Sequence, residues 1–459
     1  MRRDEKAEIA SLEGSKRPTI YICIEQKNRE YDEKLLLAAE LTLRGYRCYI
    51  GTHAAIWALL RVKNDQSGIY FDKGTQLPII MNWIKTKCKY FVVMDVELGP
   101  VIRNVDLMFS SFNDYPAISR LYPGSDEIID RFLCIGPRIF EGARTAFPKN
   151  VSVAVMTGWP RMDIWENIGS ELYKREIASI RNKHGKFLLF ASDFTFITDP
   201  GINGSREEEL SHFGWNLKTN FEFFMKTVEI LKVWDEDPNV PAVILRPHIS
   251  EDPRVWKKAL GNTTKTHVIH SGDITQWILA SEGLIHRGST TAVQAVLANK
   301  PTYFLAESTN FDGDEITHQI SNFTVGKEFP PVPQFNIPIN LETRSQQLQI
   351  LEKVLFRTAR SSTQEVIDVL QNLIDTPTLS HSRMKLIFDQ INIRSFRRFV
   401  GLLRHELRWK FKLTTAPSQF HFTPFGLGPF EVKRMLNLNG KYNEIRVRRM
   451  TINLWEFTL

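Results

Sequence analysis

The sequence predicts an α/β protein with two tandem domains, each built on a parallel sheet covered by helices on both faces. The chain has 459 residues, of which 42% are hydrophobic, and this exceeds what a single core normally organises. Short apolar segments of strand length alternate with segments of helical periodicity, an order typical of parallel sheets. The alternation restarts after the GWPR segment at 158–161, so we place the junction between the domains near residue 165.

The first domain is predicted over residues 19–165, after a disordered start at 1–18. TIYICIE at 19–25 is β-branched and apolar, and the helix that follows ends at Gly45. The further predicted elements of this domain are strands at 46–51, 68–73, 89–95 and 132–136 and helices around 77–86 and 126–132.

The second domain is predicted over residues 166–380. Its predicted strands are KFLLFASDF, AVILRPH, THVIHSGDI, GLIHRGS and PTYFLAE, and its predicted helices lie at 171–185, 216–234, 273–283 and 290–300. The segments 199–214 and 308–341 read as irregular loops. Because ligands of open α/β sheets bind beyond the carboxyl ends of the strands, two such domains predict a ligand cleft between these ends.

The C-terminal segment 381–459 differs in composition from the rest. The chain carries a net charge of +7, and from Arg383 onward 15 Lys and Arg residues face 5 Asp and Glu residues. The segment 383–410 is predicted to form a basic amphipathic helix pair. Such a tail fits nucleic acid, an anionic membrane surface or an acidic face of the protein's own body. We retain the last two alternatives and expect no nucleic-acid partner.

The sequence also indicates a compartment. No run of about 18 uncharged apolar residues occurs, and the charged N-terminus does not resemble a signal peptide. The four cysteines are scattered without a CxxC pair, which argues against a zinc site or a disulfide framework. We expect a cytoplasmic protein, attached peripherally to the inner face of the inner membrane if the tail binds lipid.

Residues 286–301, HRGSTTAVQAVLANKP, place polar residues between a predicted strand and a predicted helix. Ser289 or Thr290 suits the N-cap position of this helix, and helix N-termini favour anions. With Arg287 as an added cation, the segment predicts a phosphate-binding site. The alternative is an ordinary capped helix.

A second strand, AVILRPH, ends in polar residues. Arg246 and His248 suit phosphate binding, and parallel strand ends bring them to the same edge as the HRGST segment. Between the two, Asp273 is predicted to cap a helix rather than to act in catalysis.

Carboxylates follow two further strands. Asp95 and Glu97 are alternate residues after an apolar strand of the first domain, so both are predicted to face one side. Such a pair can divide acid and base roles, although solvated loop acids are an equal alternative. Asp193 follows a strand of the second domain. Arg161 and Asp163, at the predicted junction, fit a structural role.

Several of these motifs together resemble a known family. The stretch IYICIEQKNREYDEKLLLAAELTLRGYRCYIG and the motifs DVELG, GWPRMD, LRPH and HRGSTTAVQAVLANKPTYF resemble the bacterial surface carbohydrate biosynthesis proteins, glycosyltransferases of the GT-B architecture. The resemblance covers about residues 19–330. More distantly, the RPH and STT elements resemble motifs of CMP-sugar-using capsule enzymes, the sialyltransferases and the retaining Kdo transferases.

The resemblance implies roles for individual residues. It implies that His248, Ser289, Thr290 and Thr291 hold the CMP part of a donor. The retaining Kdo transferases use a carboxylate nucleophile, and Asp193 is a candidate for that role by its position alone. The family shows Asp-Glu-Glu where this chain has Asp95-Val96-Glu97, so one acid is missing. The chain also has Pro-His where the related motif is His-Pro.

These observations predict a GT-B glycosyltransferase that moves a Kdo-like or other acidic sugar from a CMP donor to a bacterial surface polysaccharide such as lipopolysaccharide or capsule. We assign Glu97 as acid/base with Asp95 beside it, Asp193 as nucleophile, and Arg246, His248, Arg287, Ser289, Thr290 and Thr291 to the nucleotide. No cofactor or metal is expected beyond the nucleotide-sugar substrate, and the expected acceptor is a lipid-linked glycan. The alternatives are a nucleotide-sugar epimerase and a non-catalytic scaffold at the membrane surface.

Overall fold

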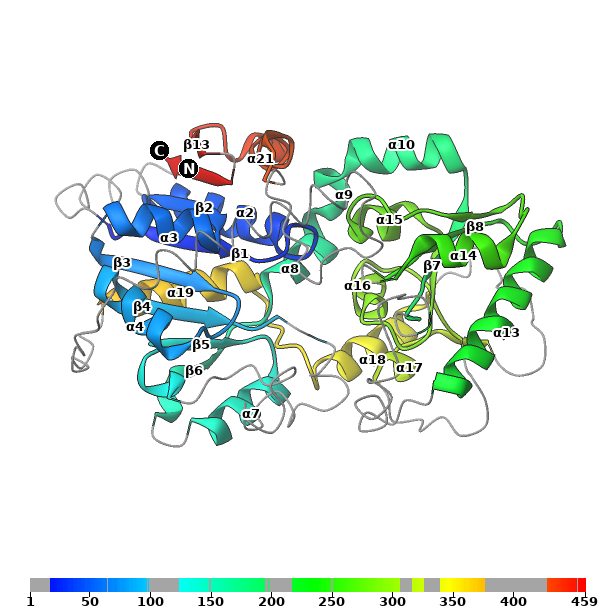
Figure 1. Ribbon diagram of the computed structural model, residues 1–459, viewed down its shortest axis with the longest axis horizontal. Coiled ribbons are helices and arrows are strands. Elements are labelled where there is room, and N and C mark those ends of the chain that lie inside the picture. The colour runs from blue at the N-terminus through cyan, green and yellow to red at the C-terminus, as the bar shows by residue number, and fades with distance from the viewer. Residues whose placement is uncertain are drawn as a thin grey trace. The chain divides into compact units, whose positions relative to one another are not determined.

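The computed structural model describes residues 17–63, 65–96, 98, 124–147, 150–194, 197, 217–248, 251–305, 316–325, 339–375, 427–451 and 453–459. These residues form two compact units, each with its own sheet (Figure 1). Unit 1 contains the described residues up to 164, those of 352–375 and those from 427 onward. Unit 2 contains the described residues from 165 to 351.

Unit 1 is built on an eight-stranded sheet with the order β13-β14-β2-β1-β3-β4-β5-β6, the first sheet. Strands β1 to β6 are parallel, whereas β14 is antiparallel to β2 and β13 is antiparallel to β14. The strands are β1 (Ile20–Ile24), β2 (Cys48–Thr52), β3 (Asp65–Asp72), β4 (Cys88–Met94), β5 (Arg131–Cys134), β6 (Ala154–Met156), β13 (Arg446–Thr451) and β14 (Leu454–Thr458). The helices are α2 (Lys27–Leu43), α3 (His53–Val62), α4 (Pro78–Lys87), α7 (Pro137–Ala146), α8 (Pro160–Asp163), α19 (Ser362–Asp375) and α21 (Pro429–Leu436).

Unit 2 is built on a six-stranded, fully parallel sheet with the order β12-β11-β10-β7-β8-β9, the second sheet. The strands are β7 (Phe187–Ala191), β8 (Ala242–Arg246), β9 (Thr266–Val268), β10 (Gly283–His286), β11 (Thr302–Leu305) and β12 (Phe323–Val325). The helices are α9 (Gly169–Leu172), α10 (Lys174–His184), α13 (Leu217–Glu236), α14 (Pro253–Leu260), α15 (Ile274–Ala280), α16 (Thr291–Leu297), α17 (Ile316–Gln319) and α18 (Leu341–Leu351).

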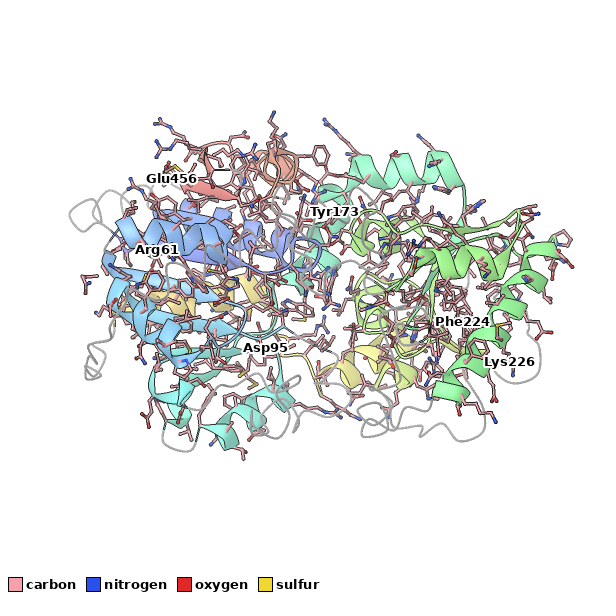
Figure 2. All side chains as sticks on the ribbon, viewed as in Figure 1. Arg61, Asp95, Tyr173, Phe224, Lys226 and Glu456 are labelled. Carbon is pink, nitrogen blue, oxygen red and sulfur yellow. The ribbon has the colours of Figure 1, made fainter. Side chains whose placement is uncertain are left out.

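An aromatic core holds α13 and α14 to the second sheet. The Trp256 side chain is fully buried and lies with its ring centroid 4.7 Å from that of Phe224 and 5.5 Å from that of Phe194. In Figure 2, Phe224 lies between α13 and the sheet, whereas Lys226 lies on the outer side of the same helix. Aromatic side chains bury large apolar areas, so this core fixes the segment after β7 against the helices that flank it.

The alternation of parallel strands and helices predicted from the sequence is confirmed in both units. One predicted helix is wrong. In the segment 126–132 the structure has a 3-10 turn at Ser125–Glu127, and Arg131 already belongs to β5. Ile128 and Ile129 lie buried in the turn that leads into β5, and Phe132 lies buried within that strand.

The predicted boundary of the second domain at residue 380 differs from the structure, because α19 packs in unit 1 beside α2 and α8 (Figure 1). The Asp163 carboxylate accepts the N–H groups of Ser362 at 3.0 Å and Thr363 at 2.8 Å and thereby caps α19. Val366 and Leu370 of α19 are fully buried. Asp163 therefore has the structural role that its position suggested.

The C-terminal residues also differ from the predicted amphipathic segment. The predicted helix pair at 383–410 lies outside the described residues. From residue 427 onward the chain forms α21 and a hairpin whose strand β14 extends the first sheet beyond β2. Ion pairs fasten this part to α2, among them Arg434 with Asp32 at 2.6 Å and Lys27 with Glu431 at 2.6 Å. The described part of the tail thus packs on the protein's own body.

The four cysteines are buried free thiols. None of the helices in the described part of the chain combines the length and the apolar composition that crossing a membrane requires.

Candidate functional site

The second sheet has a topological switch point between β7 and β10. The chain runs from β7 to β8 and β9 on one side of β7 and then returns to β10 on the other side. Loops that leave two adjacent strands in opposite directions open a crevice at their carboxyl ends, and open α/β sheets bind ligands there.

The strand register brings the predicted segments to this edge. Ala191 of β7 pairs with Arg246 of β8 on one side and with His286 of β10 on the other. The RPH and HRGST segments therefore leave the sheet at the same level, with Asp193 following the strand between them. The prediction that these segments share one edge of one sheet is confirmed.

Arg287 lies across the switch point on an aromatic platform. Its guanidinium carbon is 4.9 Å from the ring centroid of Phe194, which follows β7, and 4.8 Å from that of Phe223 on α13. Its NH2 group donates to Asn220 Oδ1 at 2.6 Å. The guanidinium is half-buried, and a cation held over aromatic faces within 6 Å is stabilised by their quadrupoles. The platform thus orients a positive charge at the predicted phosphate site.

The residues after Arg287 form a tight turn into α16. Gly288 has a φ of 79°, a left-handed conformation that glycine adopts without strain. Ser289 Oγ accepts the Thr291 N–H at 3.3 Å and lies 2.8 Å from Thr291 Oγ1, so Ser289 caps the helix as predicted. The half-buried Thr290 hydroxyl makes no hydrogen bond to the described residues. Thr290 can therefore offer its hydroxyl to a ligand.

His286 holds this turn in place through hydrogen bonds of its ring. The side chain is fully buried, and its Nδ1 accepts the Gly288 N–H at 3.2 Å. Nε2 must therefore carry the proton, which it donates to Ser321 Oγ at 2.9 Å, and Ser321 Oγ donates to Thr317 O at 2.7 Å. Burial, followed by the nearby His318, lowers the pKa of His286 to about 3. A neutral imidazole thus connects the turn to α17.

Arg246 braces the neighbouring loop. Its guanidinium donates to three backbone carbonyls after β9, those of Ile269 at 3.2 Å, Gly272 at 2.8 Å and Ser271, and stands 5.3 Å from the ring centroid of Trp277. Burial lowers its pKa to about 10, so it remains charged at neutral pH. These hydrogen bonds direct two of the guanidinium nitrogens at the protein itself.

His248 and Asp273 flank this braced loop. The His248 carbonyl accepts the Glu251 N–H at 2.8 Å, and the His270 ring lies 3.3 Å from the same oxygen. The imidazole of His248 is half-buried at the edge of the sheet. Asp273 accepts the Thr275 N–H at 2.7 Å and caps α15, which confirms the prediction for that residue.

Glu251 is a buried acid at this edge that the sequence analysis did not single out. Its carboxylate accepts hydrogen bonds from the Ser192 hydroxyl at 2.6 Å, the Phe194 N–H at 2.7 Å and the Trp256 indole at 2.6 Å. Burial, with a smaller contribution from Asp193, raises its pKa to about 7. Glu251 therefore fixes the loop that carries the half-buried Asp193. The sequence SEDP at 250–253 shows no pattern that indicates a functional acid; it indicates only the start of a helix.

The acids predicted for the first domain lie in unit 1. Asp95 directly follows β4 and is almost fully buried (Figure 2). Glu97 lies outside the described residues. The structure consequently places Asp95 at the carboxyl edge of the first sheet, and the predicted alignment of the two acids remains a prediction.

The carboxyl edge of the second sheet thus combines an oriented guanidinium, a hydroxyl without a partner among the described residues and a half-buried carboxylate. Within this set the guanidinium and the hydroxyl can neutralise and orient a phosphate group. Asn220 and the two phenylalanines of the platform come from α13 and the β7 loop, and their apolar spacing alone gave no functional signal.

No protein-family model matches the chain, and no curated protein is significantly similar to it in sequence. Among solved structures, a variant of the wall teichoic acid polymerase TagF is similar with a TM-score of 0.51 and 11% identity, over 79% of this chain and 90% of that chain. A UDP complex of MnaA from S. aureus has a TM-score of 0.44 and 12% identity, over 80% and 100%. Anabaena HepE with UDP and glucose has a TM-score of 0.42 and 12% identity, over 77% and 100%. The chain therefore has the two Rossmann-like units of the GT-B architecture.

Proposed function

We propose that the protein is a metal-independent glycosyltransferase that binds a nucleotide sugar at the carboxyl edge of the second sheet. The observation that carries the proposal is Arg287, which is held over two aromatic rings at the switch point beside the Ser289-Thr290 turn. The similarity of fold to a wall teichoic acid polymerase supports an activity in the assembly of surface polymers.

The proposed chemistry follows from the charges at this edge. Breaking the bond between a sugar and a nucleotide phosphate leaves negative charge on the phosphate, which Arg287 and the Ser289-Thr290 turn are placed to stabilise. His248 and Thr291 complete the proposed nucleotide contacts, and Arg246 acts by holding the adjacent loop. Asp193 is the proposed nucleophile of a retaining reaction, with Asp95 and Glu97 as the acids on the acceptor side.

A nucleotide screen by thermal shift tests the donor. We propose a CMP-linked acidic sugar, since the RPH and STT elements resemble CMP-sugar enzymes. CMP should then raise the melting temperature more than UDP or GDP, because ligand at 100 times its Kd adds about 2.7 kcal/mol. Preference for UDP or GDP would contradict the CMP assignment and leave the nucleotide site intact, whereas no stabilisation by any nucleotide would contradict the site.

Variants locate the binding to the proposed residues. Thr290→Val removes a hydroxyl at nearly constant volume and should weaken nucleotide binding about tenfold, since a lost hydrogen bond to a charged group costs about 1.5 kcal/mol. Ser170→Ala removes an exposed hydroxyl from α9 of the same unit and serves as the control. Equal affinity of both variants by calorimetry would remove Thr290 from the site.

An acceptor assay separates the transferase from an epimerase. Incubation with a nucleotide sugar alone should leave the sugar unchanged, whereas a lipid-linked glycan acceptor should become extended. Isomerised sugar in the absence of an acceptor would favour the epimerase.

We also propose that unit 1 contacts an anionic membrane surface. Arg446 and Arg449 of β13 are exposed at the open edge of the first sheet, and basic residues near an anionic bilayer each contribute about 1 kcal/mol. Arg446→Gln with Arg449→Gln should reduce co-sedimentation with anionic liposomes at low salt. Unchanged co-sedimentation would show that these arginines are not the contact.

A further inference from the structure

Glu251 directly precedes the N-cap of α14 and is buried, with 1% of the residue exposed. A buried carboxyl group is costly unless hydrogen-bond donors satisfy its oxygens. The Ser192 hydroxyl and the Trp256 indole each donate to Oε2 at 2.6 Å, and the Phe194 N–H donates to Oε1 at 2.7 Å. Because Glu251 is shielded from any ligand, a role in function must act through these three partners.

Two of the three partners are the neighbours of Asp193 in the chain. Ser192 and Phe194 follow β7 with Asp193 between them, and the same carboxyl group binds the side chain of the first and the backbone of the second. The Ser192 N–H also donates to Arg246 O at 3.1 Å, which continues the pairing of β7 with β8. Asp193 is half-buried, so its backbone is fixed on both sides while part of the residue stays exposed.

Phe194 connects Glu251 to Arg287. The Phe194 ring is buried and its centroid lies 5.5 Å from that of Trp256, whose indole binds the same carboxyl group. The Arg287 guanidinium carbon lies 4.9 Å from the centroid of the Phe194 ring. A guanidinium within about 6 Å of an aromatic face is attracted to it. The placement of Phe194 therefore helps to decide where the positive charge of Arg287 lies.

The backbone of Glu251 is held independently of the loop after β7. Its N–H donates to His248 O at 2.8 Å within the loop after β8. The next residue, Asp252, caps α14 by accepting the Arg254 N–H at 2.9 Å. The carboxyl group of Glu251 can thus serve as a fixed point to which the loop after β7 is attached.

Asp235 of α13 is a second buried acid of unit 2 with a similar set of partners. It accepts the N–H groups of Thr264, Lys265 and Thr266, each at 2.7 Å. These residues lead into the amino end of β9, whereas the partners of Glu251 follow the carboxyl end of β7. Because the strands are parallel, the two acids hold loops at opposite edges of the sheet, and Glu251 is the one at the edge proposed to bind the nucleotide.

We propose that Glu251 is a positioning residue of the nucleotide site, which fixes Asp193 through its two neighbours in the chain and the Arg287 guanidinium through the ring of Phe194. The proposal rests on the glycosyltransferase function proposed above. In a nucleotide sugar the anomeric carbon is bonded to an oxygen of the phosphate, so a nucleophile and a cation that act on them must be spaced to match. Glu251 sets this spacing, because both groups are positioned from one carboxyl group.

The substitution Glu251→Gln tests the proposal, because the amide is of similar size but has one oxygen for the three donors. The affinity for CMP, measured by calorimetry, should fall about fivefold, the factor that corresponds to the loss of a cation–π contact. With CMP-Kdo as donor, kcat should fall by about 10²-fold, the cost of misplacing a reacting group by about 1 Å. The KM for the acceptor should stay the same.

Asp235→Asn is the matched control, because it alters a buried carboxylate that also accepts three N–H groups in unit 2. It should lower the urea midpoint and leave the CMP affinity and kcat unchanged. Phe194→Leu completes a double-mutant cycle with Glu251→Gln. If Glu251 acts through the Phe194 ring, the double variant should bind CMP about fivefold more weakly than wild type, whereas independent effects would multiply to about 25-fold.

Ser192→Ala serves as a second variant in case Glu251→Gln does not fold, because it removes one donor and leaves the Phe194 N–H bound. It should lower kcat and leave the CMP affinity nearly unchanged. Wild-type affinity and kcat in Glu251→Gln, or wild-type kcat in Ser192→Ala, would overturn the positioning role while the transferase stands. If the screen selects UDP or GDP, that nucleotide replaces CMP throughout. If wild-type protein binds none of the three, the proposed function fails, and the positioning role fails with it.

Discussion

Two arginines at one edge of the second sheet have different roles because different groups surround their guanidinium groups. Arg246 donates to carbonyls of the loop after β9, whereas Arg287 is stacked on aromatic rings and donates a hydrogen bond to Asn220. The sequence placed both beside a phosphate, since each is an arginine at or directly after the end of a strand. The carbonyls that surround Arg246 come from a loop 23 to 26 residues later, and no local pattern reports that approach.

Lysine substitutions should separate these roles, because lysine keeps the charge but lacks the planar fork. Arg246→Lys should lower the stability of unit 2 by about 1–3 kcal/mol, as three carbonyls of the loop after β9 lose hydrogen bonds to the guanidinium. Arg287→Lys should leave the urea midpoint nearly unchanged and weaken nucleotide binding. Chemical denaturation and calorimetry on the two variants measure both quantities, and a reversed pattern would exchange the two assignments.

Glu251 predicts a pH dependence of stability. Its pKa is about 7 in the folded protein against 4.5 as the ordinary value, so the folded state holds a proton that the unfolded state releases between these values. Stability should therefore fall as pH rises from about 4.5 to 7, by at most about 3 kcal/mol, since one pKa unit corresponds to about 1.4 kcal/mol.

Glu251→Gln should remove this contribution while lowering stability at pH 5, because the amide has one oxygen where three donors contact the two oxygens of the Glu251 carboxyl group. Burial also raises the pKa of Glu33 in unit 1 to about 7, so Glu33→Gln is the counterpart for the other unit. Urea denaturation at pH 5 and pH 7.5 measures the difference, and parallel losses in wild type and Glu251→Gln would contradict the assignment.

At the scale of elements, the chain segment before α19 packs closely against the end of β5, where Gly136 permits the close approach. A Cβ atom on Gly136 would lie 1.9 Å from the Val354 carbonyl oxygen, while Phe356 N–H donates to Ile135 O at 2.8 Å. Gly136 has extended backbone, so close approach rather than an unusual φ requires glycine there.

Gly136→Ala should therefore displace residues 352–356. It should lower the free energy of unfolding of unit 1 by about 1–3 kcal/mol or more, the usual range for overpacking. Gly74→Ala, where a Cβ would meet nothing within 4 Å, is the control in the same unit. Equal urea midpoints for the two variants would show that the segment moves aside without cost.

The sequence predicted elements well where the signal was local. Strands β1, β4 and β7 are apolar runs that are buried as parallel strands require. The caps at Ser289 and Asp273 follow from preferences within two residues. The return of α19 to unit 1 could not be predicted, because its determinant is the Asp163 carboxylate 199 residues before Ser362.

At the scale of the whole molecule, two sheets with separate cores predict two unfolding transitions. Nucleotide should raise only the transition of unit 2, and Glu251→Gln should lower the same one. Gly136→Ala should lower the other. Differential scanning calorimetry resolves these shifts, and a single transition that moves with every variant would show that the units unfold together.

The arrangement of the whole molecule could be predicted from the sequence only in part. Alternating strands and helices predicted two Rossmann-like domains, and the carboxyl edges of their sheets follow from that order. The contact of His53 Nε2 with Asp72 Oδ1 at 2.8 Å did not follow, because it depends on β2 and β3 lying on either side of β1. Strand order is set when the sheet assembles, so it cannot be predicted from the short apolar segments taken one at a time.

The position of β14 has a consequence for synthesis of the protein. Strand β2 is made before unit 2, and β14, which covers its edge, is made after unit 2. Throughout translation of unit 2 the nascent chain therefore presents an open parallel edge, a template for pairing with other chains. Synthesis of β14 closes that edge, so maturation of the first sheet depends on residues that follow unit 2 in the chain.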